Sequence, residues 1–305
     1  MEESIREFLM EKRGYLKKSP QIILERLGLY PVSGVEIIKR EAICRNIKKA
    51  VRRELKEENK KVKVDYGKIA PNHNAKKRKK SKAYKGDPNN VLVIGDLHEP
   101  FCLEGYLDHC KQIQIKENCG TVVFIGDIID NHYSSYHEQD PDGFGAGEEL
   151  DRAIAKIENW YDAFPEATVI IGNHDRLVYR KAFSGGVSKR WIREYHEVLN
   201  TPGWEFLEAI VINGVNYNHG EGGTARTRMK NEMQSQVQGH HHNQFYIDYN
   251  VSPVCRIFGV QVGCGVDRKQ YAMAYGKHFK KPVIGCGTII GKNPVPRIHP
   301  MLLED

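Results

Sequence analysis

Three short apolar stretches in this chain each end in glycine followed by a polar residue of a type that binds metals. They are residues 91–94 before Gly95-Asp96, residues 121–125 before Gly126-Asp127, and residues 167–171 before Gly172-Asn173. Each stretch has the length and composition of a buried β-strand, and the helix-like segments 103–117 and 148–162 lie between them. Strands that alternate with helices predict consecutive βαβ units and a buried parallel sheet.

The second half of the chain has its predicted strands closer together. These strands are residues 205–212, 215–218, 244–250, 255–263 and 282–290. Close spacing favours mixed or antiparallel pairing, so we predict a second sheet packed on the first. The expected fold class is α/β, a two-sheet β-sandwich flanked by helices over residues 91–305, with a small helical region at the N-terminus.

Residues 1–90 differ from the rest of the chain in charge and in pattern. They hold 25 Lys and Arg against 12 Asp and Glu, a net charge of +13, whereas residues 91–305 carry −6. Residues 1–56 show short helical patterns that suit a helix-turn-helix DNA-binding region and equally a small helical bundle. Residues 57–90 include the basic run 76–80 and predict a flexible linker. Such charge favours contact with nucleic acid, although a solvated linker explains it equally well.

The composition excludes several classes of protein. No apolar run approaches the ~20 residues that cross a bilayer, and the N-terminus lacks the pattern of a signal peptide. The seven cysteines form no CxxC pair, which argues against a disulfide framework and against a structural zinc cluster. We therefore expect a cytoplasmic protein without a membrane partner; the oligomeric state is left open.

Polar residues at the predicted strand ends indicate a shared site. The carboxyl ends of strands in open α/β sheets converge on the ligand crevice. The residues delivered there are Asp96, His98, Asp127, Asp130, Asn173, His174 and Asp175. Histidines follow two later strands, as His219 and as the run 240–242. Residues two apart in extended chain point the same way, so His240 and His242 can face one site while His241 faces elsewhere.

The set of side chains is large enough for two metal ions. The predicted ligands are Asp96, His98, Asp127, Asn173, His219, His240 and His242. Each motif alone occurs often by chance, and only the ordered set of strand ends carries the prediction. Mixed nitrogen and oxygen ligands favour transition metals or Zn²⁺ over Ca²⁺, which prefers oxygen. We expect two divalent ions, with Mn²⁺ first and Fe, Zn²⁺, Ni²⁺ or Mg²⁺ as alternatives.

Five motifs of this chain, in this order, resemble those of the calcineurin-like metallophosphoesterase superfamily. They are Gly95–His98, Gly126–Asp130, Gly172–Asp175, His219 and Gly239–His242. The resemblance covers residues 90–290 and implies the metallophosphoesterase fold and a catalytic domain over residues 91–305. It implies nothing about residues 1–89.

The resemblance also implies a role for each motif residue. Ligands of a first ion would be Asp96, His98, Asp127 and His242, and those of a second Asp127, Asn173, His219 and His240, with Asp127 bridging. His174 would be the catalytic histidine, which stabilises charge on the phosphoryl group or protonates the leaving oxygen. Asp96 or Asp130 would orient it. Two-metal hydrolysis uses metal-activated water and needs no serine or cysteine nucleophile.

The expected activity is that of a hydrolase acting on phosphate esters. Ser/Thr protein phosphatases of the superfamily carry Arg-Gly after the second motif, where this chain has Asn131-His132. The Gly-Asn-His-Asp form of the third motif is similar to the nuclease and phosphodiesterase branches. We therefore favour a phosphodiesterase or nuclease on nucleic acid. The alternative is a phosphatase or phosphodiesterase on small phosphoesters or nucleotides, with the basic arm serving localisation or assembly. The complete ligand set argues against a third interpretation, a non-catalytic scaffold.

Further basic, aromatic and histidine side chains lie near the motifs in sequence. The basic ones are Arg176, Arg180, Lys181, Lys189, Arg190, Arg226, Arg228 and Lys230. They could bind phosphate or simply be surface residues. Tyr133, Tyr136 and Trp191 could stack on a base, but we expect them to pack in the core or at its rim. His132 and His137 are expected not to be ligands.

Overall fold

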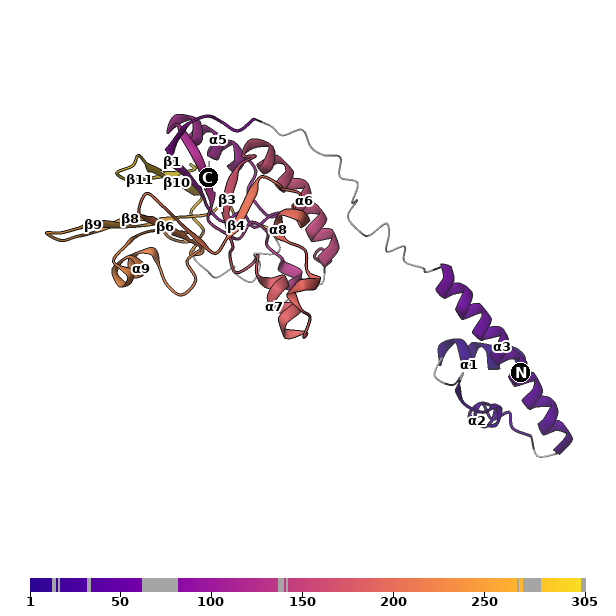
Figure 1. Cartoon of the computed structure of the whole chain (residues 1–305). Coiled ribbons are helices and arrows are strands. Elements are labelled where there is room, and N and C mark those ends of the chain that lie inside the picture. The colour runs from indigo at the N-terminus through magenta and orange to yellow at the C-terminus, as the bar shows by residue number, and fades with distance from the viewer. Residues whose placement is uncertain are drawn as a thin grey trace. The chain divides into compact units, whose positions relative to one another are not determined.

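The computed structural model describes residues 1–12, 15, 17–31, 34–61, 82–136, 140, 142–267, 269–270 and 281–302. The chain divides into two compact units, residues 1–71 and 72–305 (Figure 1). The expected linker overlaps the end of the last helix of the first unit, and its basic run 76–80 lies outside the described residues.

In its described residues the N-terminal unit contains the helices α1 (Glu2–Glu11), α2 (Pro20–Arg26) and α3 (Gly34–Lys61). Ser19 caps α2 by accepting a hydrogen bond from the Ile22 amide, and Pro20 suits the first turn because it has no amide to satisfy. The helices share a small core of Ile5, Leu9, Ile23, Leu24, Cys44 and Val51. The expected helical region is confirmed, and α3 runs past residue 56. DNA contact by this unit stays a prediction.

The first sheet of the larger unit has the order β11-β10-β1-β2-β3-β4. Its strands β1 (Asp87–Ile94), β2 (Cys119–Phe124), β3 (Ala167–Ile170) and β4 (Trp204–Leu207) are parallel. The strands β10 (Gly285–Ile290) and β11 (Val295–Pro300) add antiparallel pairs at the β1 edge. Helices α5 (Tyr106–Lys116) and α6 (Ala146–Ala163) connect the parallel strands, as predicted.

The second sheet has the order β5-β6-β7-β9-β8. Its strands are β5 (Ala209–Ile212), β6 (Val215–Asn218), β7 (Ser235–Gln238), β8 (Phe245–Val251) and β9 (Arg256–Val262). Parallel and antiparallel pairs both occur, so the predicted mixed sheet is confirmed. Helix α9 (Ala225–Glu232) connects β6 to β7.

Two strand predictions were wrong. Residues 205–212 do not form one strand, because the chain leaves the first sheet after β4 and enters the second as β5, with Glu208 between them. Residues 282–290 were expected in the second sheet, but β10 pairs with β1 in the first. Both errors concern the choice of pairing partner, which depends on distant strands and not on local pattern.

The core forms two layers because the central strands are buried on both faces. Along β1, Val91 and Val93 pack toward the second sheet, whereas Leu92 and Ile94 pack toward the helices. This double burial explains why the strands are continuously apolar and do not alternate with polar residues. Because β1, β2 and β3 are parallel, their carboxyl ends lie together at one edge of the sandwich.

The shorter elements lie on the surface near that edge. They are the 3₁₀ turns η2 (His132–Ser134) and η3 (Lys189–Trp191) and the helices α7 (Leu177–Ser184) and α8 (Tyr195–Val198). All seven cysteines are free thiols. Among the described residues, no helix combines the length and the apolar character that a membrane span requires.

Candidate metal centre

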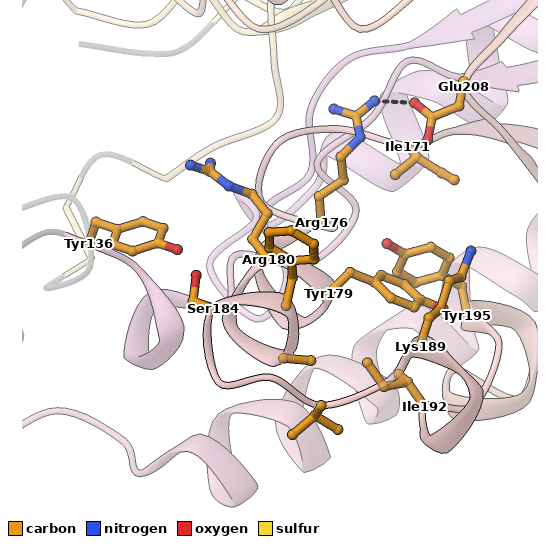
Figure 2. A pocket seen from close by; sticks show the side chains of 13 residues that line it. Tyr136, Ile171, Arg176, Tyr179, Arg180, Ser184, Lys189, Ile192, Tyr195 and Glu208 are labelled. Carbon is orange, nitrogen blue, oxygen red and sulfur yellow. Dashed lines mark hydrogen bonds and ion pairs between the residues drawn. The ribbon is translucent and has the colours of Figure 1, made fainter.

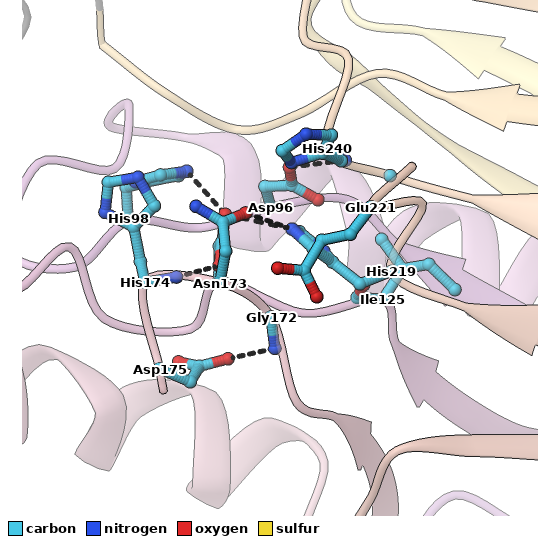
Figure 3. A network of polar contacts seen from close by, with 12 residues as sticks. Asp96, His98, Ile125, Gly172, Asn173, His174, Asp175, His219, Glu221 and His240 are labelled. Atoms are coloured by element: carbon cyan, nitrogen blue, oxygen red, sulfur yellow. Dashed lines mark hydrogen bonds and ion pairs between the residues drawn. The ribbon is translucent and has the colours of Figure 1, made fainter. Parts of the chain in front are cut away.

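The predicted ligands converge at one edge of the sandwich, beyond the carboxyl ends of five strands (Figure 3). The first sheet contributes the residues that follow β1, β2 and β3, and the second contributes those that follow β6 and β7. Within the described part of the chain, three groups of side chains could hold a metal ion, with ligand atoms within 4.8 Å of one another. The groups are Asp96 with His98 and His242, Asp127 with His219 and His240, and His98 with Asp127 and His174.

In the first group the side chains already face one another. His242 Nε2 lies 3.0 Å from Asp96 Oδ2 and 3.2 Å from His98 Nε2. Asp96 Oδ1 is buried and has no hydrogen-bond partner in the structure. A buried carboxylate oxygen without a partner is costly unless a cation satisfies it. This orphaned oxygen beside two imidazole nitrogens fits a divalent metal ion.

The second group surrounds Asp127 from the other side. Its Oδ2 lies 3.1 Å from His219 Nε2, which is also 2.9 Å from the side-chain oxygen of Asn173. The His219 and His240 rings are 5.0 Å apart. Asp127 therefore takes part in two groups, and the arrangement brings together all seven predicted ligands.

The carboxylates and imidazoles of the cluster shift one another's pKa values. Burial alone would raise the pKa of Asp127, but the neighbouring His219, His174 and His98 hold it well below its usual range. For His219 burial acts in the opposite direction and lowers the pKa. The Asp127 carboxylate outweighs this effect of burial and raises the pKa of His219 to about 10. The carboxylate is thus charged and ready for a cation.

Asp130 contacts two histidines through different atoms. Its carboxylate lies 2.5 Å from His98 Nδ1, and its backbone oxygen lies 2.5 Å from His174 Nδ1. Each Nδ1–H thus has an acceptor, and the Nε2 atoms remain available for a metal or a substrate. The expectation that Asp130 orients His174 applies to its backbone oxygen, because its carboxylate oxygen is 3.6 Å from His174 Nδ1.

Left-handed backbone recurs at the predicted ligands. His98, Asp127 and His240 have φ values of 51°, 48° and 65°. Side-chain-bearing residues rarely adopt this region, and each instance costs on the order of 1–3 kcal/mol. The fold therefore holds three of the predicted ligands in unfavourable backbone conformations.

The glycines that precede predicted ligands have no room for a side chain. A Cβ on Gly172 would lie 2.8 Å from Asp127 Cγ and closer still to its Oδ1, and a Cβ on Gly239 would overlap Asp96 in the same way. A Cβ on Gly126 would overlap the His219 ring. Gly126, Gly172 and Gly239 thus let one strand end approach a predicted ligand on another.

Gly172→Ala is accordingly expected to lower the free energy of unfolding by about 1–3 kcal/mol, as overpacking does. Thermal denaturation measures it, with Gly147→Ala as the matched control. Gly147 lies in α6, and an added Cβ there meets nothing within 4 Å. Equal melting temperatures for the two variants would contradict the steric account.

Asp175 was predicted at the site but its role is structural. Its carboxylate accepts hydrogen bonds from the amides of Gly172 (2.8 Å), Ile128 (3.1 Å) and Ile129 (3.4 Å), as Figure 3 shows for Gly172. It therefore joins the loops that carry Asp127 and Asn173. Burial, and then the charge of Asp127, raises the pKa of Asp175 to about 6.

Glu149 was missed by the sequence analysis. This buried carboxylate of α6 accepts hydrogen bonds from the amides of His132 (2.6 Å) and Tyr133 (3.0 Å). It thereby fixes the loop that follows Asp130. A glutamate on an amphipathic helix gives no sequence signal of burial, so only the structure reveals it.

The other candidates separate into distinct environments. His132 is buried near Asp130 but belongs to none of the three groups, and His137 lies outside the described residues. Arg226 and Arg228 pair with Asp248 and Glu232. The expectation of core or rim packing was wrong for Trp191, which is 86% exposed.

Comparisons with known proteins agree with this geometry. The family model of calcineurin-like phosphoesterases matches residues 90–263, more than half of the chain. No curated protein sequence matches significantly.

Similar solved structures include Vacuolar Protein Sorting 29 from Cryptosporidium parvum, with 11% identity and a TM-score of 0.36 over 71% of this chain and 98% of that one. The E. coli phosphoesterase Yfce has 12% identity and a TM-score of 0.34, over 66% and 88% of the two chains. Nuclease MPE from Pseudomonas putida has 12% identity and a TM-score of 0.32, over 69% and 86%. The matched family model spans the strand ends that carry the clustered aspartates and histidines, and the chain therefore belongs to the calcineurin-like phosphoesterase family.

Proposed function

We propose that this metal-dependent phosphoesterase is a phosphodiesterase that acts on nucleic acid. The observation that carries the phosphoesterase chemistry is the position of Asp127 Oδ2, which lies 3.5 Å from His98 Nε2 and 3.1 Å from His219 Nε2, beside the orphaned Asp96 oxygen. A carboxylate shared in this way suits two adjacent ions. We assign Asp96, His98, Asp127 and His242 to one ion and Asp127, Asn173, His219 and His240 to the other. Mn²⁺ is the metal that we expect to support the highest activity.

Bound divalent ions supply activated water and charge neutralisation at the phosphate. The chain's own residues then position the groups around the reacting phosphorus. Asp130 holds His98 and His174 through their Nδ1 atoms. Burial lowers the pKa of His174, but Asp127 and Asp130 more than offset this and raise it above its ordinary value. A protonated His174 can donate from Nε2 to the leaving oxygen.

Charge supports nucleic acid as the substrate. Residues 1–90 carry +13, and the surface elements next to the centre add Arg180, Lys181, Lys189 and Arg190. A polyanion gains affinity from each phosphate that such side chains neutralise. Small phosphoesters would gain little from a basic N-terminal region, so they are the weaker alternative.

An activity screen is expected to show Mn²⁺-dependent cleavage of bis-p-nitrophenyl phosphate and of DNA or RNA. Cyclic nucleotides and p-nitrophenyl phosphate serve as the competing substrates, and chelation followed by metal replacement tests the metal requirement. Activity confined to the monoester would refute the phosphodiesterase proposal. Activity on cyclic nucleotides alone would favour the small-molecule alternative.

The N-terminal region is expected to increase DNA affinity in a salt-dependent way. Full-length protein and a truncation that keeps residues 82–305, and so lacks both the helical unit and the basic run 76–80, are compared by fluorescence anisotropy across a salt series. Each phosphate contact made by the removed region steepens the dependence of log affinity on log salt by about 0.7–0.9. Identical affinities and slopes for both proteins would remove the role proposed for this region.

A further inference from the structure

A pocket of about 450 Å³ lies beside the third ligand motif (Figure 2). Ile171 and Arg176, which flank the segment 172–175, both line it. Tyr195, another lining residue, donates a hydrogen bond from its hydroxyl to the Asp175 backbone oxygen at 3.1 Å. The pocket therefore adjoins the loop that carries Asn173 and His174. Its volume is in the range of about 300–1,000 Å³ that is typical of small-ligand sites.

The walls of the pocket are aromatic and aliphatic. Tyr179 of α7 and Tyr195 of α8 meet edge to face with centroids 5.2 Å apart, and Tyr195 stacks on Phe206 behind it. Tyr136 comes from the segment before α6, and Ile192 follows η3 (Figure 2). Flat rings and aliphatic side chains of this kind suit a planar, largely apolar group.

One end of the pocket is polar. Arg176 pairs with Glu208, which lines the pocket, and with Glu221, which follows His219. The carboxylate of Glu208 could accept a hydrogen bond from an exocyclic amino group, as carboxylates do with cytosine. Arg176 neutralises this carboxylate, so the polar end offers hydrogen-bonding groups without excess negative charge. The apolar walls and this polar end together suit a base.

Positive charge surrounds the aromatic wall. Lys181 Nζ lies 4.2 Å from the centre of the Tyr136 ring, and Lys189 Nζ lies 4.9 Å from that of Tyr179. Arg180 lies 5.1 Å from Tyr136. Within the described ranges no carboxylate forms a salt bridge with these three cations. Cations interleaved with tyrosines are typical of surfaces that bind single-stranded nucleic acid.

We infer that this pocket receives one unpaired nucleobase of a single-stranded nucleic acid whose neighbouring phosphate lies at the metal centre. The inference rests on the proposed function and names its substrate as single-stranded. A duplex keeps its bases paired and stacked, so it cannot place one in the pocket without disruption. The surrounding cations contact the flanking phosphates, and Tyr179 stacks on the base.

The test compares two dinucleotides with the Mn²⁺-loaded full-length protein. One is a deoxyadenosine dinucleotide, and the other is the same molecule with both bases replaced by hydrogen. We expect kcat/KM to be about tenfold higher for the dinucleotide with bases, as expected for one base–aromatic stack. Tyr179→Ala should reduce this ratio toward one, whereas Tyr179→Phe should keep it.

Tyr136→Ala should lower the same ratio of kcat/KM values, and this residue belongs to a different segment of the chain from Tyr179. Tyr249→Ala is the matched control, because this exposed tyrosine lies on β8 and outside the pocket. A ratio of one in the unmodified protein overturns the inference, as does an equal loss on both substrates in Tyr179→Ala.

Bis-p-nitrophenyl phosphate separates failure of the pocket from failure of the proposed function. Hydrolysis of this compound with no preference between the dinucleotides refutes the pocket alone. If no diester is hydrolysed, the proposed function fails, and equilibrium dialysis of both dinucleotides against chelated protein still decides the pocket. Equal binding of the two then overturns it, and about tenfold tighter binding of the one with bases supports it.

Discussion

Replacing His174 with alanine is expected to lower kcat on bis-p-nitrophenyl phosphate by about 10²–10⁴-fold, the usual contribution of a general acid. The bound metal should remain, because the seven proposed ligands do not include this residue. Its Nδ1 hydrogen-bonds to the Asp130 backbone oxygen, which leaves Nε2 for the leaving group. Steady-state kinetics and metal analysis of the same preparation measure both effects.

Metal content decides between two roles for His174. The residue lies in one of the groups that could hold an ion, with His98 and Asp127. Loss of one ion per chain in His174→Ala would make it a ligand, and unchanged turnover would exclude a catalytic role. His196→Ala, at an exposed histidine of α8, is the control and should behave like the unmodified protein.

Asp127→Asn is expected to produce the second large effect. The substitution keeps the shape of the side chain but removes the charge shared by two ligand groups. Loss of an outer hydrogen-bonding partner of a ligand lowers metal affinity or activity about 10–100-fold, so loss of the shared ligand should exceed about 10²-fold. Metal analysis should show at most one ion per chain.

Asp130→Asn provides the graded comparison. Its carboxylate contacts His98 Nδ1 and takes no place among the proposed ligands, so activity should fall by only about 10–100-fold. Circular dichroism would confirm that both variants fold. Similar activity losses in Asp127→Asn and Asp130→Asn would contradict the bridging role that we propose for Asp127.

Local patterns predicted most of the elements that position the site. The apolar stretches that became β1, β2 and β3 are recognisable because burial on both faces demands continuous hydrophobicity. The glycines before Asp127, Asn173 and His240 are equally visible in sequence. The structure adds the reason, since a Cβ at Gly126, Gly172 or Gly239 would overlap a predicted ligand from another strand.

Pairing partners were beyond the reach of local pattern. Nothing within residues 205–212 indicates that β4 and β5 belong to different sheets, because the separation arises from their partners β3 and β6. The same holds for β10, which pairs with a strand almost two hundred positions earlier, as in the register of Ile94 with Cys286. Such pairings are decided by the whole packed core.

The sequence by itself determined the types of the predicted ligands, their order and their place after strands, because strand periodicity and the metal-binding chemistry of side chains are local properties. Only the tertiary structure decided how these residues meet. It placed Asp127 between two sets of histidines, left Asp96 Oδ1 without a protein partner, and used Asp175 to join the loops around them. Distances between groups far apart in the chain depend on the packing of two sheets, and no local segment specifies that packing.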